Sequence, residues 1–326
     1  MVGEQMYDEY AAYYGAGNYG DITVSAALQG TGMYALMAEV VREEIGMKVM
    51  VYTVTAQYVM HEFEDAIGDC NLGTVDANAD GVHAWDEGVA FFVGSLPGPT
   101  AADSSGKLFY ALGDKRCANY GTCATEDANG MLTVGTSSVN TRLIEAFNAG
   151  LQAITADVGS GEADCGVAES YIPVITSLMN IPLMQGMLRY AYKADPEGGA
   201  QGAKEQAEGY AFWYAIAPRL DTCDSAAAAR IADAMSITAS PAVPGGFAAV
   251  LADAQSMYEC LGITCEDVGG LINSEGTGYY PGFGPTETVV SDGEGGLTVV
   301  EGEVVEEKSS AARVTVALAA LVAALL

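Results

Sequence analysis

The 326-residue sequence predicts an all-α protein: two pseudo-repeated helical bundles, then a disordered acidic stalk and an apolar terminal helix. Three observations support this fold class. Hydrophobic residues make up 50% of the chain, which is enough for a large core. Long stretches rich in Ala, Met, Leu and Val contain no proline. Outside the stalk, no run of alternating β-branched residues is bounded by hairpin turns. A sheet of more than three strands within residues 20–260 would contradict the prediction.

The first elements are two long helices, expected at Asp21–Glu44 and Lys48–Ile67. Both stretches lack proline, and the first ends near a glycine, Gly46. Because a glycine often follows the last residue of a helix, we expect a break between the two helices at this point.

An internal repeat organises the chain. The segment 87–97 (EGVAFFVGSLP) matches 208–218 (EGYAFWYAIAP) at five of eleven positions without a gap. Upstream, 57–66 (QYVMHEFEDA) aligns with 185–194 (QGMLRYAYKA). Agreement in the same order predicts a duplicated helical unit. The expected organisation is a Tyr-rich N-terminal segment (1–19), helical repeat 1 (20–125), helical repeat 2 (139–236), an extension with a cysteine pair (237–284), an acidic stalk (285–310) and an apolar membrane anchor or GPI-type signal (311–326).

The formal net charge of −30 limits the partners of this protein. A phosphate backbone would be repelled, so nucleic acid is excluded. Cations would be attracted, although solubility alone also explains such a charge.

The C-terminus predicts attachment to a membrane at the cell surface. Residues 314–326 (VTVALAALVAALL) are uncharged and almost wholly apolar, and they follow an acidic, Gly-rich stretch. Thirteen residues reach about 20 Å as a helix, short of the roughly 30 Å hydrocarbon core, so a spanning helix is marginal. Small residues before the tail, Ser309 to Ala311, resemble a GPI-attachment signal. The first ten residues lack the basic and apolar regions of a secretory signal peptide, so we expect either that a signal peptide precedes the given residues or that the surface location is wrong.

Seven cysteines favour disulfides in an oxidising compartment. Cys117 and Cys123, and likewise Cys260 and Cys265, are close enough in sequence to close short loops. The other three can form one more bridge and leave one thiol over: Cys70, Cys165 and Cys223. No C-x-x-C occurs, so zinc-ribbon and thioredoxin-type sites lack their motif. Seven reduced cysteines in a cytosolic protein are the alternative, and the connectivity stays open.

Residues 76–87 match the twelve-residue calcium loop D-x-[DN]-x-[DN]-G-x5-E, between two predicted helices. The pattern assigns calcium to five residues: Asp76, Asn78, Asp80, the carbonyl of Val82, and Glu87. No second loop is present to pair with this one. A polar turn between two helices is therefore the alternative.

Both histidines of the chain lie beside acidic residues. His61 and Glu64 are about one helical turn apart, and His83 and Glu87 are related as i and i+4. If the two helices pack side by side, imidazoles and carboxylates converge on one metal ion. Carboxylate, phenolate and imidazole are the donors that ferric iron prefers. The candidate iron ligands are therefore His61, Glu64, His83 and Glu87, followed by Tyr58 and Asp86.

The calcium and iron hypotheses share Glu87, so one of them is wrong in detail. In the second copy of the repeat, Arg189 and Lys204 replace the histidines. That copy is expected to contribute packing or a positive charge to an anion. Common enzyme signatures, among them G-x-S-x-G, H-E-x-x-H and the Walker loop, are absent from the sequence, so we expect a protein that is not an enzyme.

The block HAWDEGVAFFVGSL (83–96), followed by GKLFYAL (106–112) and by DKRC (114–117), resembles the algal iron-assimilating FEA-type proteins. This family includes the iron-starvation-induced phytotransferrins. CLGITC (260–265) is similar to the family's C-terminal part, so the likeness covers about residues 20–275. It implies a secreted or surface-anchored protein that captures ferric iron, with carbonate as co-anion in the phytotransferrin branch. Through His61 and Glu64, the chain more distantly resembles imelysin-like proteins, some of which are supposed metallopeptidases.

The expected function is capture of ferric iron at the cell surface, with iron, a small anion and a membrane as partners. Fe(III), carbonate and Ca²⁺ are the expected bound ions. Imidazole and carboxylate must lose their protons to bind a metal, and imidazole ordinarily titrates near pH 6.5. Iron bound at pH 8 is therefore expected to be released between about pH 7 and 5. The alternatives are an imelysin-like hydrolase, in which the metal activates water, and a calcium-stabilised adhesion protein.

Overall fold

The computed structural model describes residues 1–94, 106–123, 137–155, 163–198, 202–280, 282–285, 287–291 and 297–301. The elements are, in chain order, α1 (Gln5–Tyr14), α2 (Tyr19–Gln29), the short 3-10 helix η1 (Gly32–Tyr34), α3 (Glu39–Val49), the π-helix η2 (Met50–Thr55), α4 (Ala56–Leu72), α5 (Gly81–Val93), α6 (Phe109–Tyr120), α7 (Ser138–Thr155), α8 (Cys165–Ala194), α9 (Ala203–Cys223), α10 (Ser225–Met235), α11 (Phe247–Ser256), α12 (Cys265–Val268), β1 (Glu287–Ser291) and β2 (Leu297–Glu301).

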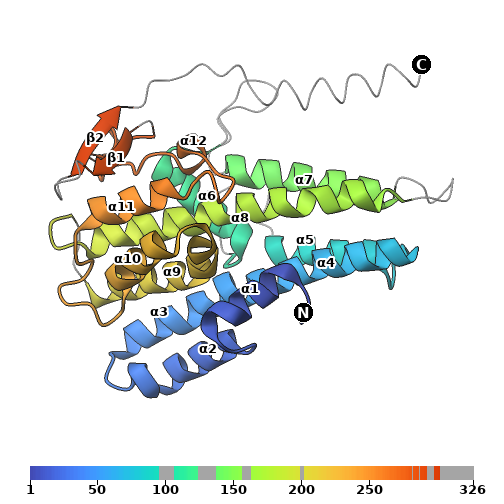
Figure 1. Cartoon of the computed structure of the whole chain (residues 1–326), viewed down its shortest axis with the longest axis horizontal. Coiled ribbons are helices and arrows are strands. Elements are labelled where there is room, and N and C mark those ends of the chain that lie inside the picture. The colour runs from blue at the N-terminus through green and yellow to red at the C-terminus, as the bar shows by residue number, and fades with distance from the viewer. Residues whose placement is uncertain are drawn as a thin grey trace.

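The all-α prediction is confirmed, because helices account for most of the described chain and its only sheet has two strands. These strands, β1 and β2, pair antiparallel from Glu287 with Glu301 to Ser291 with Leu297, next to α11 (Figure 1). The prediction of a disordered stalk was wrong at these two strands. Each strand contains a Thr-Val-Val run, and β-branched residues favour the extended backbone of a sheet.

The expected break between the first two helices lies at a different glycine. Helix α2 ends at Gly30, whose left-handed φ of 63° suits a C-terminal cap. Gly46 instead lies inside α3, where an added Cβ would be 2.9 Å from the Leu28 side chain. Gly46 therefore lets α2 approach α3 closely. As a result, α3, η2 and α4 form one continuous helical stretch over residues 39–72.

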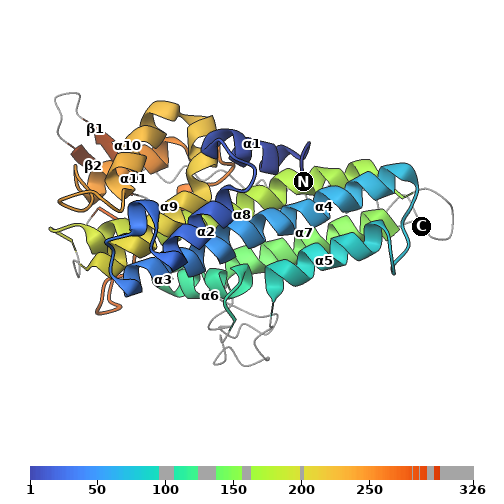
Figure 2. The same cartoon turned by 90° about the horizontal axis from the view of Figure 1, so that it is seen from below.

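Two helix pairs form the centre of the molecule. Helix α4 packs on α5, α8 packs on α9, and α7 packs on α8. Figures 1 and 2 show α4, α5, α7 and α8 side by side at one end, with α3, α9, α10 and α11 at the other. The matching segments 57–66 and 185–194 lie in α4 and α8, and 87–93 and 208–218 lie in α5 and α9. The buried side chains form one cluster that extends from Met6 to Phe283, so the two copies share a core. The duplication itself stays a prediction.

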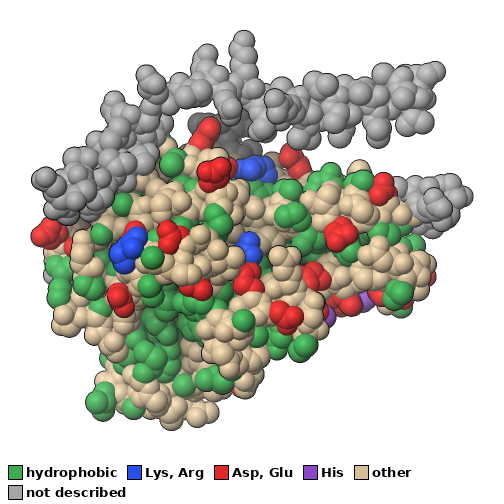
Figure 3. Space-filling view, viewed as in Figure 1, with side chains coloured by type: hydrophobic (Ala, Val, Ile, Leu, Met, Phe, Trp, Pro, Cys, Tyr) green, Lys and Arg blue, Asp and Glu red, His purple; other side chains and the backbone are tan. Residues whose placement is uncertain are grey.

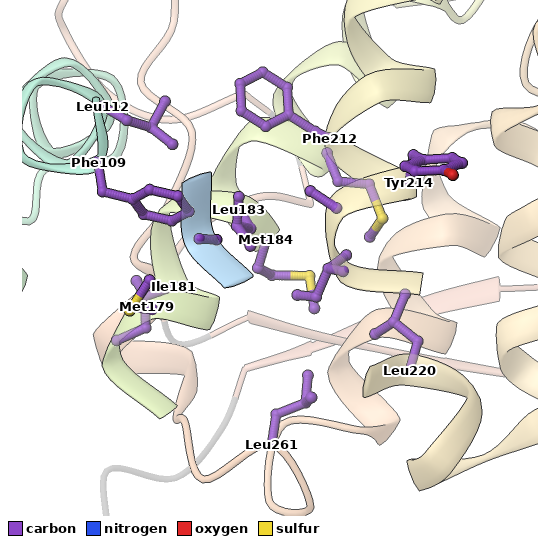
Figure 4. Packing of buried hydrophobic residues seen from close by; sticks show 14 of the residues in the cluster. Phe109, Leu112, Met179, Ile181, Leu183, Met184, Phe212, Tyr214, Leu220 and Leu261 are labelled. Carbon is purple, nitrogen blue, oxygen red and sulfur yellow. The ribbon is translucent and has the colours of Figure 1, made fainter. Parts of the chain in front are cut away.

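Aromatic residues dominate the middle of this core. Trp85 is fully buried on α5, its ring lies 4.7 Å from that of Phe63, and its Nε1 donates a hydrogen bond to the Phe147 carbonyl at 3.0 Å. Figure 4 shows a second part of the core, which includes Phe109 of α6, Met184 of α8 and Phe212 of α9. The helices are thereby joined by large apolar side chains, and this burial is the main stabilising contribution.

Three disulfides are present, and only part of the expected pairing is confirmed. Cys117 pairs with Cys123 as expected. The pair Cys260–Cys265 was wrong, because Cys260 bonds to Cys223 at the end of α9. Cys265 begins α12, is half-buried and has a free thiol, whose pKa is raised by burial. The third bridge, Cys70–Cys165, joins α4 of the first predicted copy to α8 of the second.

None of the helices in the described part of the chain is both long and apolar enough to cross a membrane. The predicted anchor at 311–326 and most of the stalk lie outside the described residues.

Candidate functional site

The predicted iron ligands divide into two groups that are neighbours on α4, because the His61 ring of one lies 5.5 Å from the Tyr58 ring of the other. His61 and Glu64 contact the N-terminal region. The Nδ1 atom of His61 lies 2.7 Å from the Glu4 carboxylate. Glu64 accepts hydrogen bonds from the backbone N–H groups of Gln5 and Met6, the first residues of α1, and burial and then Glu4 raise its pKa. Since these N–H groups have no partner within a helix, Glu64 caps α1 and holds it against α4.

The other group lies between α4 and α5, and we call it the α4–α5 cluster: Tyr58, Glu62, His83 and Glu87. His83 Nε2 is 3.5 Å from Glu87 Oε1, and both side chains are about half exposed. The Tyr58 hydroxyl is hydrogen-bonded to Glu62. That bond raises the pKa of Tyr58, since the carboxylate favours the protonated phenol. The cluster thus combines phenol, carboxylate and imidazole groups at the surface.

Glu62 is the member that sequence reasoning missed. It is only 5% exposed, and burial, then the negative charge of Glu87, raise its pKa. Its position four residues after Tyr58 on α4 was the available signal, because i and i+4 share a helix face. Asp86 is exposed on the same helix as Glu87. Within the residues that the structure describes, no three His, Cys, Asp or Glu side chains are placed around one point where a metal ion could bind.

The proposed calcium loop has a different backbone from the one that its motif requires. The motif needs a sharp turn at its sixth residue, but Gly81 is already the first residue of α5, with Asp80 before it. Val82 is buried in the first turn of that helix, and Glu87 lies about 7.5 Å further along its axis. The Asp76 carboxylate accepts a hydrogen bond from the Asn78 N–H at 2.7 Å. The loop conformation is that of a polar turn, and calcium binding there stays a prediction.

A second candidate site is a cavity of about 210 Å³ between α3, η2, α6, α8 and α9. Four basic residues line it: Lys48, Lys107, Lys115 and Arg116. Its apolar wall includes Tyr52 and Tyr190, and burial raises the pKa of both phenols to about 12. Such a group is unusual in this protein: on the face of the molecule that Figure 3 shows, many Asp and Glu side chains are spread over the surface and few Lys or Arg lie among them. Arg189, one of the two residues that replace the histidines in the second predicted copy, lies 5.5 Å from the centroid of the Tyr190 ring in this wall.

Of the four basic residues that line the cavity, Lys48 alone has ion pairs among the described residues. Lys48 contacts Glu44 and lies 2.9 Å from Glu208, and Lys204 bonds to Glu44 on the outside. Burial, and then the neighbouring cations Lys107, Arg116 and Lys48, lower the pKa of Lys115. The sequence did not reveal this group, because its members come from α3 and from the stretch 107–116, which only the fold brings together.

A family model described as low iron-inducible periplasmic protein matches residues 2–271 of the chain. No curated protein and no solved structure matches it.

Proposed function

This chain belongs to the family of low iron-inducible periplasmic proteins, and from that premise we propose that it binds ferric iron at the cell surface for iron acquisition, with carbonate as co-anion. The family description links its members to iron shortage and to the periplasm. Three disulfides support an oxidising compartment. The resemblance of the block at 83–96 to FEA-type proteins agrees with this assignment.

The observation that supports an iron site best is the uncompensated negative charge of the α4–α5 cluster. Within the described residues, Glu62 and Glu87 have no Lys or Arg partner in any ion pair, and only His83 lies beside Glu87. Burial and the charge of Glu87 disfavour the ionised form of Glu62. A bound cation would remove both penalties, and Fe(III) prefers this donor set. We therefore assign iron to Tyr58, Glu62, His83 and Glu87, with Asp86 beside them; these side chains do not surround one point in the structure, so the assignment requires them to turn toward the bound ion.

In this assignment, His61 and Glu64 serve structure and not metal binding. Both are committed to the N-terminal region, His61 through Glu4 and Glu64 through the first turn of α1. The hydrolase alternative requires these two residues to hold a water-activating metal, which would release that end of α1. The cluster assignment leaves α1 in place.

Replacement of Glu87 by Gln should weaken Fe(III) binding by roughly 10–100-fold or more. Loss of a group that only supports a metal ligand already lowers metal affinity by that factor, and Glu87 is assigned as a ligand itself. A tyrosinate bound to Fe(III) should absorb visible light, and Tyr58→Phe should remove that absorption. Both are measured by titrating the full chain with a chelated iron salt at pH 8, with and without bicarbonate. Glu64→Gln is the matched control on the other side of α4. Unchanged affinity and colour in the Glu87 and Tyr58 variants would refute the assignment.

The pH dependence of iron release should depend on one histidine only. Iron bound at pH 8 should be released as the pH falls from about 7 to 5, because protons compete for the imidazole and carboxylate donors. His83→Gln should weaken binding at pH 8 and flatten the release curve, whereas His61→Gln should change neither. Iron retention measured by equilibrium dialysis across this range compares the two. An equal effect of both substitutions would mean that His61 also reaches the metal.

A further inference from the structure

The basic cavity is the feature that iron binding leaves unexplained. The whole chain has 13 Lys and Arg residues against 43 Asp and Glu, yet four of the basic residues line this one cavity. Two more, Arg189 and Lys193, lie over the ring of Tyr190, each 5.5 Å from its centroid. Glu208 is the single carboxylate in the lining, and Lys48 neutralises it. The cavity therefore has a net positive charge inside a strongly acidic protein.

Arg116 is a buried basic residue of this cavity, and within the described part of the chain it has unused hydrogen-bond donors. It is 8% exposed, and its Nε and Nη1 atoms have no hydrogen-bond partner among the described residues. Its guanidinium carbon lies 5.9 Å from the centroid of the Tyr190 ring. A buried charge with unused donors destabilises a fold unless a partner supplies the acceptors. The planar guanidinium matches the paired oxygens of a carboxylate or phosphate.

The size and charge of the cavity define the missing partner. Its volume of about 210 Å³ is below the roughly 300–1,000 Å³ of sites for drug-sized ligands, so the partner is small. Lys107, Lys115 and Arg116 have no carboxylate partner among the ion pairs of the described residues, so an anion with more than one charge is favoured. Val51 and Tyr52 of the π-helix η2 also line the cavity, and π-helical turns are frequent at functional sites.

We propose that this cavity binds a small oxyanion with at least two negative charges, such as phosphate or a di- or tricarboxylate, with Arg116 as the central ligand and Lys107 and Lys115 beside it. The site uses none of the residues assigned to iron. The anion site is therefore independent of the proposed iron site, and it is tested on iron-free protein.

Calorimetry of the full iron-free chain with inorganic phosphate, citrate and bicarbonate in a low-chloride buffer tests this proposal. Phosphate and citrate should bind, and binding should weaken as sodium chloride is raised. Arg116→Gln should weaken the binding by about tenfold or more, because a charged hydrogen-bond partner is lost. Arg142→Gln is the matched control, since Arg142 is about half exposed and pairs with Asp267 away from the cavity.

Lys115→Gln provides the second variant, because Lys115 lies at the exposed side of the cavity and its replacement leaves the core intact. It should weaken anion binding several-fold with an unchanged circular dichroism spectrum. If Arg116→Gln does not fold, this variant tests whether the cavity binds the anion. Absence of phosphate and citrate binding at millimolar concentration would overturn the proposal. So would binding of bicarbonate alone, or equal binding by the wild type and a folded Arg116 or Lys115 variant.

Discussion

Replacing Cys70 and Cys165 together by Ala is expected to lower the free energy of unfolding by roughly 4 to 5 kcal/mol. The two cysteines are 95 residues apart, and a crosslink that closes a long loop removes much of the entropy of the unfolded chain. The bridge joins the end of α4 to the first residue of α8, so it also connects the two helix pairs. Guanidinium unfolding curves of the wild type and the double variant measure the difference.

The Cys117–Cys123 bridge supplies the matched control. Its cysteines are six residues apart, and the same loop relation gives about 2 kcal/mol for its removal. Both double variants lose one disulfide and gain no charge. Equal losses of stability would contradict an entropic origin and would assign the effect to local packing instead.

Trp85→Ala is expected to lower the free energy of unfolding by about 3–5 kcal/mol, the usual loss when a buried aromatic residue leaves a cavity. The surroundings of Trp85 leave little room for collapse. An added Cβ at Gly150 would be only 2.1 Å from the Trp85 ring, which shows how closely α7 approaches α5. The substitution also leaves the Phe147 carbonyl without the indole N–H.

The chain has two tryptophans, and the second is the natural control. Trp213 is partly exposed on α9, and its Nε1 has no hydrogen-bond partner among the described residues. Trp213→Ala should therefore lower the free energy of unfolding clearly less than Trp85→Ala does. Thermal and denaturant unfolding of the two variants is followed by circular dichroism, because this signal does not depend on tryptophan fluorescence and each variant lacks one tryptophan. A Trp85 variant as stable as the Trp213 variant would show that α5 is not central to the core.

The helical class was predictable because it depends on local composition. Proline-free, Ala-rich stretches form helices wherever an apolar face finds a partner. The end of the first helix was not predictable, because Gly30 and Gly46 look alike in sequence. Only the crossing of α2 over α3 decides which glycine caps a helix and which one makes room for Leu28.

The candidate site was predictable only where its members are close in sequence. The neighbours His83 and Glu87 are together as expected, one helical turn apart. Glu4 is 57 residues from His61, so spacing could not reveal that it occupies that imidazole. Spacing also could not reveal that Cys223 is the partner of Cys260, or that Arg116 and Lys48 line the same cavity, because these residues are far apart in the sequence. Proximity across helices depends on the complete packing of the chain.

The π-helix η2 has a consequence for insertions and deletions. A π-type turn closes hydrogen bonds from i to i+5, so it accommodates one residue more than an α-turn without rotating the helices on either side. A relative that is one residue shorter between 50 and 55 would keep α3 and α4 facing the same neighbours. An alignment gap at this point therefore marks a regularised helix and not a lost element.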